Sequence, residues 1–353
     1  MESTSSAILI NRDQFGRLED DALAEFLKDA ARSLHAYRLE LREKTRREAG
    51  IAAMAAVACA LVLALFSGAG QHLWLIGPIA GIIWIGWRTN KRQVAWQAHL
   101  LSTVLPELTR GMGDVDYENN GIDPATTTPF ERLGLIQKST QKHLSHLMRG
   151  RHRNIGFELV YAELFRRSSG GSKSRARSDS VFNGLLCRIE TLAAIPFCVV
   201  IQQRRFGIPA AMSKMLESSV TSGLTQIDPG PGEFAEKFEI RAALRSDADF
   251  DLVKTLICPS LQQALLELNA QEGALIGDRA AFSAAFLDHD FFLALSRYGK
   301  TSIVGLEIER VRPFLDGGVY IFGDEADLQK HLFAVSTDIR IPHRIIDRFV
   351  EMG

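Results

Sequence analysis

Two apolar runs between Ile51 and Trp87 constrain this chain more than any other feature, because neither contains an Asp, Glu, Lys or Arg residue. Only the small polar segment 67–72 separates them. A helix needs roughly 20 apolar residues to cross the hydrocarbon core of a bilayer, and the first run, from Gly50 to Ser67, meets that requirement. The two runs therefore predict a transmembrane helical hairpin over residues 49–88.

The second run, from Leu73 to Trp87, is shorter. Pro78 within it removes one helical hydrogen bond, so we expect a kink there. All four tryptophans of the chain lie in or just beyond this run: Trp74, Trp84, Trp87 and Trp96. Indole rings are enriched where lipid meets water. Their placement favours a bilayer over the alternative interpretation, a hairpin buried inside a large soluble protein.

Basic residues flank the hairpin on both sides, and Lys and Arg near the ends of membrane spans are retained in the cytoplasm. The basic residues before the hairpin are Arg42, Lys44, Arg46 and Arg47, and those after it are Arg88, Lys91 and Arg92. The turn between the two runs carries none. We therefore expect an integral membrane protein with two spans and both termini cytoplasmic.

Small residues recur at every fourth position of the first run and at two positions of the second: Ala52, Ala56, Ala60, Ala64, Gly68, Gly77 and Gly81. Such stripes let helix backbones approach closely, either within the hairpin or between copies in a homo-oligomer. A high alanine content explains the same pattern, so these interpretations stay open. Because the runs offer no ionisable group of the kind that transport pathways use, they are typical of an anchor.

The charges of the chain balance, with 41 Lys and Arg against 42 Asp and Glu. This composition gives no global electrostatic reason to expect nucleic-acid binding. The four cysteines are scattered and form no C-x-x-C pair, which argues against a zinc site and a disulfide framework. Motifs of the common enzyme classes are absent from the sequence. We therefore expect no catalytic residue, cofactor or metal, and no nucleic-acid partner.

The hydrophobic pattern divides the chain into four parts. Residues 1–48 contain an amphipathic helix, residues 49–88 the hairpin, residues 89–129 a juxtamembrane helix ending at Pro106 and a connector, and residues 130–353 a cytoplasmic domain. The helices on either side of the hairpin are expected to pair as a stalk. The alternative is that the N-terminal helix lies flat on the bilayer.

Within the cytoplasmic part, short runs rich in β-branched and aromatic residues predict a mostly antiparallel sheet. Strands are expected at 155–165, 180–190, 197–206 and 234–244, with a hairpin formed by 279–287 and 291–298. Helices are expected at 130–148, 259–271, 325–334 and 342–351. The predicted fold class is therefore α+β, with an N-terminal amphipathic helix and a transmembrane hairpin followed by this sheet and its helices.

Two local patterns point only weakly to ligands. His143 and His146 have a spacing that places two imidazoles on one face of a helix, but no third metal ligand is near them in the sequence, so we expect both to be exposed polar side chains beside basic residues. The loop between the first two strands is basic, with Arg166, Arg167, Lys173, Arg175 and Arg177. It is expected to be a solvated hairpin loop or a contact for anionic lipid or an acidic partner.

Several short motifs follow one another along the chain: Tyr117 with Gly121, Gly150 before Phe157, and the segments 162–164, 181–185, 234–240 and 256–260. Together with the N-terminal helix and the hairpin, they resemble a family of uncharacterised bacterial membrane proteins known only as a domain of unknown function. The resemblance implies a bacterial inner membrane protein and weakens after about Pro313. It implies no activity, cofactor or catalytic residue.

Three functions fit these features. The leading hypothesis is a membrane-anchored cytoplasmic module that binds or scaffolds a protein partner. The first alternative is an enzyme that acts on a lipid or envelope intermediate at the membrane surface, and a deep pocket lined by converging polar groups would favour it. The second alternative is a sensor of anionic lipid that uses the basic loop.

Overall fold

The computed structural model describes residues 20–66, 76–110, 112, 114–119, 121–168, 177–204, 223–276, 281–296, 298–303, 306–311 and 324–350. Contacts divide the chain into two compact units. The first comprises Met1–Gly111 with Leu315–Thr337, and the second comprises Met112–Phe314 with Asp338–Gly353. The two units therefore alternate along the chain: Met112–Phe314 lies between the two segments of the first unit, and Leu315–Thr337 lies between the two segments of the second.

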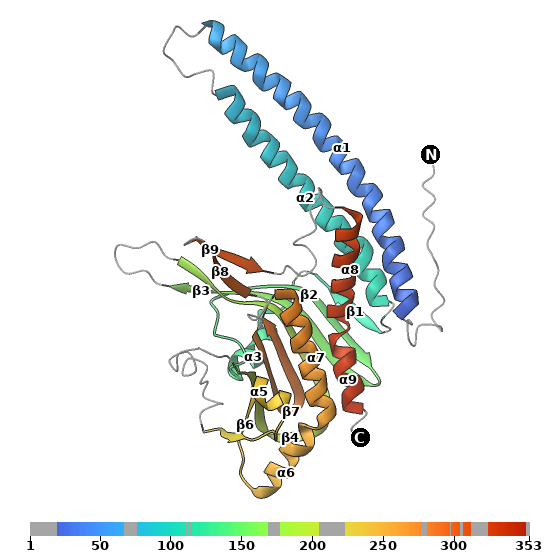
Figure 1. Ribbon diagram of the computed structural model, residues 1–353, viewed down its shortest axis with the longest axis vertical. Coiled ribbons are helices and arrows are strands. Elements are labelled where there is room, and N and C mark those ends of the chain that lie inside the picture. Colours follow the sequence, from blue (N-terminus) through green and yellow to red (C-terminus); the bar gives the residue numbers. More distant parts are fainter. Residues whose placement is uncertain are drawn as a thin grey trace. The chain divides into compact units, whose positions relative to one another are not determined.

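Two long helices dominate the first unit and pack along each other (Figure 1). Helix α1 spans Asp20–Phe66 and α2 spans Ile76–Arg110. At a rise of 1.5 Å per residue, α1 is about 70 Å long. The predicted N-terminal helix and first apolar run are thus one continuous helix, and the second run continues into the juxtamembrane helix. The predicted pairing of the flanking helices is confirmed.

Far from the segment 67–75 in the sequence, α1 and α2 share an apolar seam. The buried side chains are Leu27, Ala31, Leu34 and Leu41 on α1 and Trp96, Leu100, Val104, Leu105 and Leu108 on α2. Their spacing of three and four residues places them on one face of each helix. The proximal part of the hairpin is therefore held by ordinary core packing.

A buried arginine interrupts this seam. Arg38 donates to Nδ1 of His35 over 2.8 Å and to the backbone carbonyl of Asp324, and its guanidinium lies 5.8 Å from the ring of Trp96. Asp324 immediately precedes helix α8, which spans Glu325–Ile339. Arg38 thus links α1 to α2 and to the start of α8.

Two expectations about prolines in α2 are wrong. Pro78 lies in the first turn of α2, where a backbone N–H has no partner within the helix, so its missing N–H causes no break. The helix also continues past Pro106 to Arg110. Leu105 and Leu108, on either side of this proline, are buried, so tertiary packing holds the backbone helical across it.

The second unit is built on an antiparallel sheet of seven strands (Figure 1). Its strands are β1 Val115–Glu118, β2 Gln141–His152, β3 Ile155–Ser168, β4 Arg177–Gln203, β5 Thr225–Ile227, β6 Phe238–Ala242 and β7 Ala281–Ser296. The pairing order is β1-β2-β3-β4-β6-β5, and β7 also pairs with β4. A separate two-stranded sheet contains β8 Tyr298–Ile303 and β9 Leu306–Val311.

Strand β4 is long enough to pair with two strands, β3 and β6, one after the other along the same edge. β3 pairs with residues 177–189 and β6 with residues 199–203, while β7 follows the other edge along residues 184–202. The register shifts twice between Glu190 and Val199. The long strand is therefore irregularly paired at its centre, where its partner on one edge changes.

Short helices and alternating side chains build the core of the second unit. The helices are η3 Pro124–Thr127, α3 Thr128–Arg132, α5 Glu233–Lys237, α6 Asp247–Leu256, α7 Pro259–Ile276 and α9 Ile341–Val350. Alternate residues of β3, Val160, Ala162 and Leu164, join a core cluster with Phe130 of α3 and Leu133, which follows that helix. Helix α9 packs against β3, β4 and α7. The expected α+β class with a mostly antiparallel sheet is confirmed.

Several expected elements of this unit differ in the structure. Residues 130–148 were expected to be helical, but only α3 is, and β2 pairs with both β1 and β3. The expected strands 180–190 and 197–206 are one strand, because β7 pairs across the boundary between them. The expected hairpin around Asp288 is also a single strand, in which Asp288 has a φ of 55°. Helix α6 and strand β1 were not predicted.

Candidate functional site

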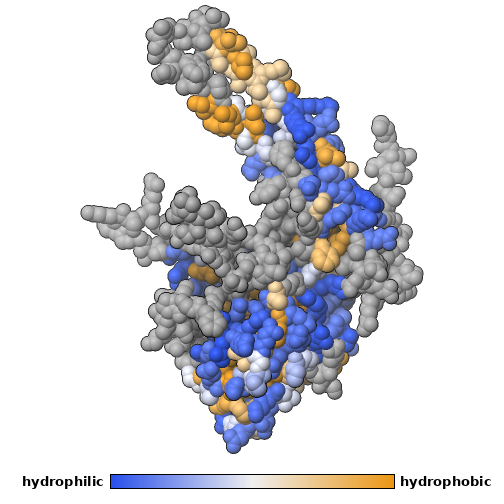
Figure 2. Space-filling model, viewed as in Figure 1, coloured by the Kyte–Doolittle hydropathy of each residue, from blue (hydrophilic) through white to orange (hydrophobic). Residues whose placement is uncertain are grey.

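The parts of α1 and α2 nearest to the segment 67–75 expose large apolar side chains. They are Ile51, Met54, Val57, Leu61 and Val62 on α1 and Ile79, Ile82, Ile83, Trp84 and Trp87 on α2. We call this set the apolar band, and Figure 2 shows orange and pale orange residues gathered at that end of the two helices. A water-exposed helix normally carries polar residues on its outer face. The band therefore needs an apolar environment that the described chain does not supply.

The small residues lie between the two helices. A Cβ added at Gly81 would be 3.1 Å from the Cβ of Ala56 and 3.9 Å from the carbonyl oxygen of Ala52. Ala52, Ala56 and Ala60 are half-buried, whereas the residues of the apolar band around them are exposed. The stripe thus serves close packing within the hairpin. The side chain of Ala64, the surroundings of Gly77, and all of Gly68 and Trp74 lie outside the described residues.

Charged residues ring the two helices where the apolar band ends. We call residues 42–48 of α1 and 88–92 of α2 the charged collar. Glu48 accepts a hydrogen bond from Arg92 and lies 3.5 Å from Nε of Arg88. Nη1 of Arg92 also donates to Oγ1 of Thr45 over 2.8 Å. These contacts bring the collar segments of both helices to the same level.

Two tryptophans stand at the border between the collar and the apolar band. Arg88 lies over the rings of Trp84 and Trp87, with its guanidinium 5.5 and 5.8 Å from their centroids. The ammonium of Lys91 is 5.7 Å from the centroid of Trp87. An apolar band, then tryptophans, then cations is the order expected along a helix that leaves a bilayer.

The segment 67–75 and the side chains of residues 63–66 and 76–78 lie outside the described part of the chain. Within the part that is described, no helix is both long enough and apolar enough to cross a membrane.

A buried polar cluster connects strands β1 to β4 in the second unit. Nδ1 of His146 is 2.9 Å from the Tyr117 hydroxyl, and the hydroxyl of Tyr161 donates to Oδ1 of Asn183 over 2.7 Å. Nδ2 of Asn183 in turn donates to Glu163 over 3.2 Å. These hydrogen bonds satisfy polar groups inside the sheet, as buried polar groups require. The cluster therefore has a structural explanation in the packing of the strands.

The backbone of His146 is unusual. Its φ of 56° lies in the left-handed region, and the register between β2 and β3 shifts between Ser145 and Met148. Such a bulge re-aims a side chain. It brings His146 to Tyr117, whereas the sequence pattern was interpreted as a helix face shared by His143 and His146. The helix face is wrong because both histidines lie on β2, and the expected exposure holds for His143 but is wrong for His146, which is buried.

A second polar cluster fixes α9 to the turn between β2 and β3. Asp347 lies 2.8 Å from Nε2 of His152 and 2.8 Å from Nε of Arg153. The ring of His343 stacks on that of His152 with centroids 4.2 Å apart, and it meets Phe157 edge-on. Burial, assisted by the neighbouring His152, lowers the pKa of His343 to about 4. His343 is therefore neutral at pH 7.

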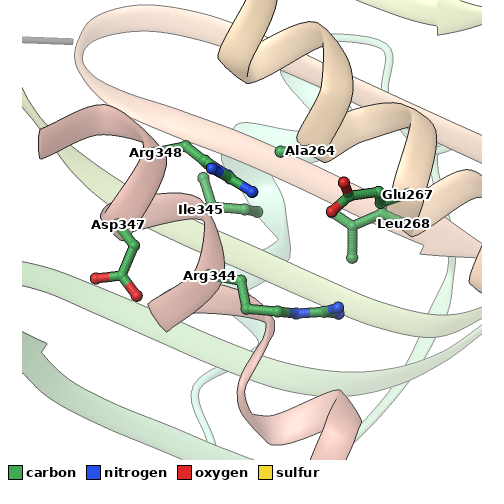
Figure 3. A pocket seen from close by; sticks show the side chains of 7 residues that line it. All are labelled: Ala264, Glu267, Leu268, Arg344, Ile345, Asp347 and Arg348. Atoms are coloured by element: carbon green, nitrogen blue, oxygen red, sulfur yellow. The ribbon is translucent and has the colours of Figure 1, made fainter. Parts of the chain in front are cut away.

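A groove lies between α7 and α9, with a volume of about 230 Å³. Ala264, Glu267 and Leu268 of α7 and Arg344, Ile345, Asp347 and Arg348 of α9 line it (Figure 3). Arg344 and Arg348 project toward α7, whereas Asp347 turns away from it. Ligand pockets usually measure roughly 300–1,000 Å³. The groove thus presents charge of both signs on a small surface.

Nucleophile and metal chemistry find little support among the described residues. Burial raises the pKa of the Cys187 thiol strongly and that of Cys198 to about 11, so both are neutral thiols at pH 7. In the described ranges, no three His, Cys, Asp or Glu side chains lie close enough to hold a metal ion.

The basic loop is only partly described. Arg166 and Arg167 are exposed near the end of β3, and Arg177 begins β4. β3 and β4 pair as far as Ser168 and Arg177, which confirms the predicted strand pairing around the loop. Lys173 and Arg175 lie outside the described residues. The predicted contact of this loop with lipid or an acidic partner stays a prediction.

Compared with models of protein families, with curated proteins and with solved structures, the chain matches none of them. The resemblance to a family of bacterial membrane proteins therefore stays a prediction.

Proposed function

We propose that this chain is an integral membrane protein whose hairpin spans the bilayer twice and anchors a cytoplasmic α+β module that binds a protein partner. The apolar band is the observation that carries the anchor. Around α1, the positions from Ile51 to Val62 are exposed except for the small residues that face α2. Exposed apolar patches of this kind mark contact with lipid or another protein. The charged collar favours lipid, because it borders the band on both helices at the same level.

The chain contains its own probe of this environment, since Cys59 is exposed within the apolar band. Cys187 and Cys198 are buried, so replacing the half-buried Cys258 by Ser leaves Cys59 as the exposed thiol of the described chain. A thiol in the hydrocarbon core does not ionise and does not meet a water-soluble maleimide. In intact membranes we expect Cys59 to stay unlabelled, and in denaturing detergent to be labelled fully.

The matched control is Ala36→Cys, which places a thiol at an exposed position of α1 on the other side of the collar. It should be labelled in intact membranes. If Cys59 reacts in intact membranes as fast as the cysteine at position 36, the band is in water and the anchor proposal fails.

The α7–α9 groove supports the binding part of the proposal. Its lining combines apolar Ala264, Leu268 and Ile345 with charged side chains, a mixture typical of protein contacts. Its volume is below the usual range for ligand pockets and gives the enzyme alternative no support. Full-length protein in detergent is expected to retain a specific partner, and Arg348→Glu is expected to lose it.

Arg149→Glu is the control, because Arg149 lies on β2 and pairs with Glu158 away from the groove. Thermal unfolding of both variants checks that the fold is retained. If the wild-type chain retains no partner above background, or if both variants lose it equally, binding at the groove is refuted.

A further inference from the structure

The charged collar has a composition unlike the rest of the chain. Residues 42–48 and 88–92 contain seven Lys and Arg against two Glu, a net charge of +5 in a chain whose overall charge is -1. Contacts of Glu48 with Arg88 and Arg92 place these segments side by side. The positive charge is therefore concentrated in one ring around the hairpin.

The height of this ring matches a layer of lipid headgroups. Seven residues of helix α1 rise about 10 Å, and the headgroup layer of each leaflet is roughly 5–8 Å thick. The exposed rings of Trp84 and Trp87 lie at the edge of the collar that borders the apolar band. Indole rings settle at the border between lipid headgroups and acyl chains. The cations of the collar then stand at the depth of lipid phosphates.

Several collar cations have side chains that reach outward. Arg46, Arg47 and Lys91 are exposed. Arg47 pairs with Glu43, but both side chains are largely exposed, and surface pairs of this kind contribute little to stability. Guanidinium and ammonium groups both bind phosphate oxygens. Exchanging a solvated pair for a phosphate contact therefore costs little.

We propose that the charged collar binds the headgroups of anionic phospholipids and enriches them around the hairpin. This inference rests on the proposed insertion of the hairpin into the bilayer. Each cation near an anionic surface strengthens such binding by about fivefold. The basic loop around Arg166 and Arg167 is the competing location for the same lipid. The collar is favoured because it adjoins the apolar band on the same two helices.

The test uses the full chain carrying Trp74→Phe, reconstituted in vesicles of phosphatidylcholine and phosphatidylglycerol. One of the two lipids carries brominated acyl chains, which quench the fluorescence of nearby Trp84 and Trp87. We expect brominated phosphatidylglycerol to quench several-fold more strongly than the same fraction of brominated phosphatidylcholine. The excess should shrink at high salt, because salt screens exposed charges.

Two triple variants separate the collar from the loop. Arg46→Gln, Arg47→Gln and Lys91→Gln together should abolish the excess quenching by phosphatidylglycerol. The matched set Arg166→Gln, Arg167→Gln and Arg177→Gln should retain it. Equal quenching by both lipids in the wild-type chain, or loss of the excess only in the second set, overturns the inference. If neither lipid quenches, the proposed insertion of the hairpin itself is wrong.

Discussion

Replacing one leucine in the apolar band by aspartate should release the hairpin from the membrane, whereas the same change elsewhere on α1 should not. Leu61 is 62% exposed and Leu39 is 47% exposed, so neither Leu61→Asp nor Leu39→Asp removes much packing within the protein. Both positions lie on one continuous helix. In water, the two substitutions would therefore cost nearly the same small amount.

In a bilayer, the free-energy costs of Leu61→Asp and Leu39→Asp differ. Leu61 lies 11 residues after Gly50, about 17 Å along the helix, which is near the middle of a hydrocarbon core roughly 30 Å thick. At that depth leucine contributes about -0.3 to -0.6 kcal/mol to insertion and aspartate costs about 2.5–3.5 kcal/mol. The difference of about 3–4 kcal/mol lowers the insertion equilibrium roughly 100- to 700-fold.

Extraction of membranes with alkaline carbonate measures the result. Wild-type chain and Leu39→Asp should stay in the membrane pellet, and most of the Leu61→Asp protein should move to the supernatant. Circular dichroism in detergent checks that both variants remain helical. If Leu61→Asp is retained as fully as Leu39→Asp, the apolar band does not lie in hydrocarbon.

Two further predictions concern the second unit. Gly150→Ala should destabilise it by about 1–3 kcal/mol in urea unfolding, because the new Cβ would lie 2.6 Å from the backbone oxygen of Asp114. Gly156→Ala on the same strand pair meets only a flexible side chain and should change stability by less than about 1 kcal/mol; equal losses would refute the steric argument. The pKa of His343 is lowered to about 4 in the folded chain, so the stability it contributes is complete above pH 6.5 and is lost as the pH falls from 6.5 to 4. His343→Gln should remove roughly 2–3 kcal/mol of that loss, and His289→Gln, at an exposed site, should leave it unchanged; identical pH profiles for all three proteins would contradict the assignment.

The long helices were predictable from sequence because their signals are local. The apolar runs and the spacing of Leu27, Ala31 and Leu34 follow from the helical period alone. The collar was visible as clusters of basic residues. The ion pairs of Glu48 were not predictable, because Glu48 is far from Arg88 and Arg92 in the sequence. Only the pairing of α1 with α2 brings them together.

The strands were harder because their boundaries depend on distant partners. Nothing local to residues 190–197 shows that β4 continues through them, since the continuity comes from β7, about a hundred residues later. The bulge that carries His146 exists only in the register between β2 and β3. The polar cluster of His146, Tyr161 and Asn183 therefore could not be assembled from spacing in the sequence.

The alternation of the two units along the chain sets an order of events during synthesis. A ribosome delivers α1 and α2 first, and it reaches α8 only after all of Met112–Phe314 has been made. Until then the buried Arg38 lacks the carbonyl of Asp324 that accepts its hydrogen bond. A chain that stops before Asp324 therefore carries an incomplete helical unit, in which Arg38 keeps its contact with His35 but lacks this carbonyl. Completion of the helical unit by α8 therefore follows translation of Met112–Phe314 but precedes that of Asp338–Gly353, the segment that carries α9 and completes the second unit.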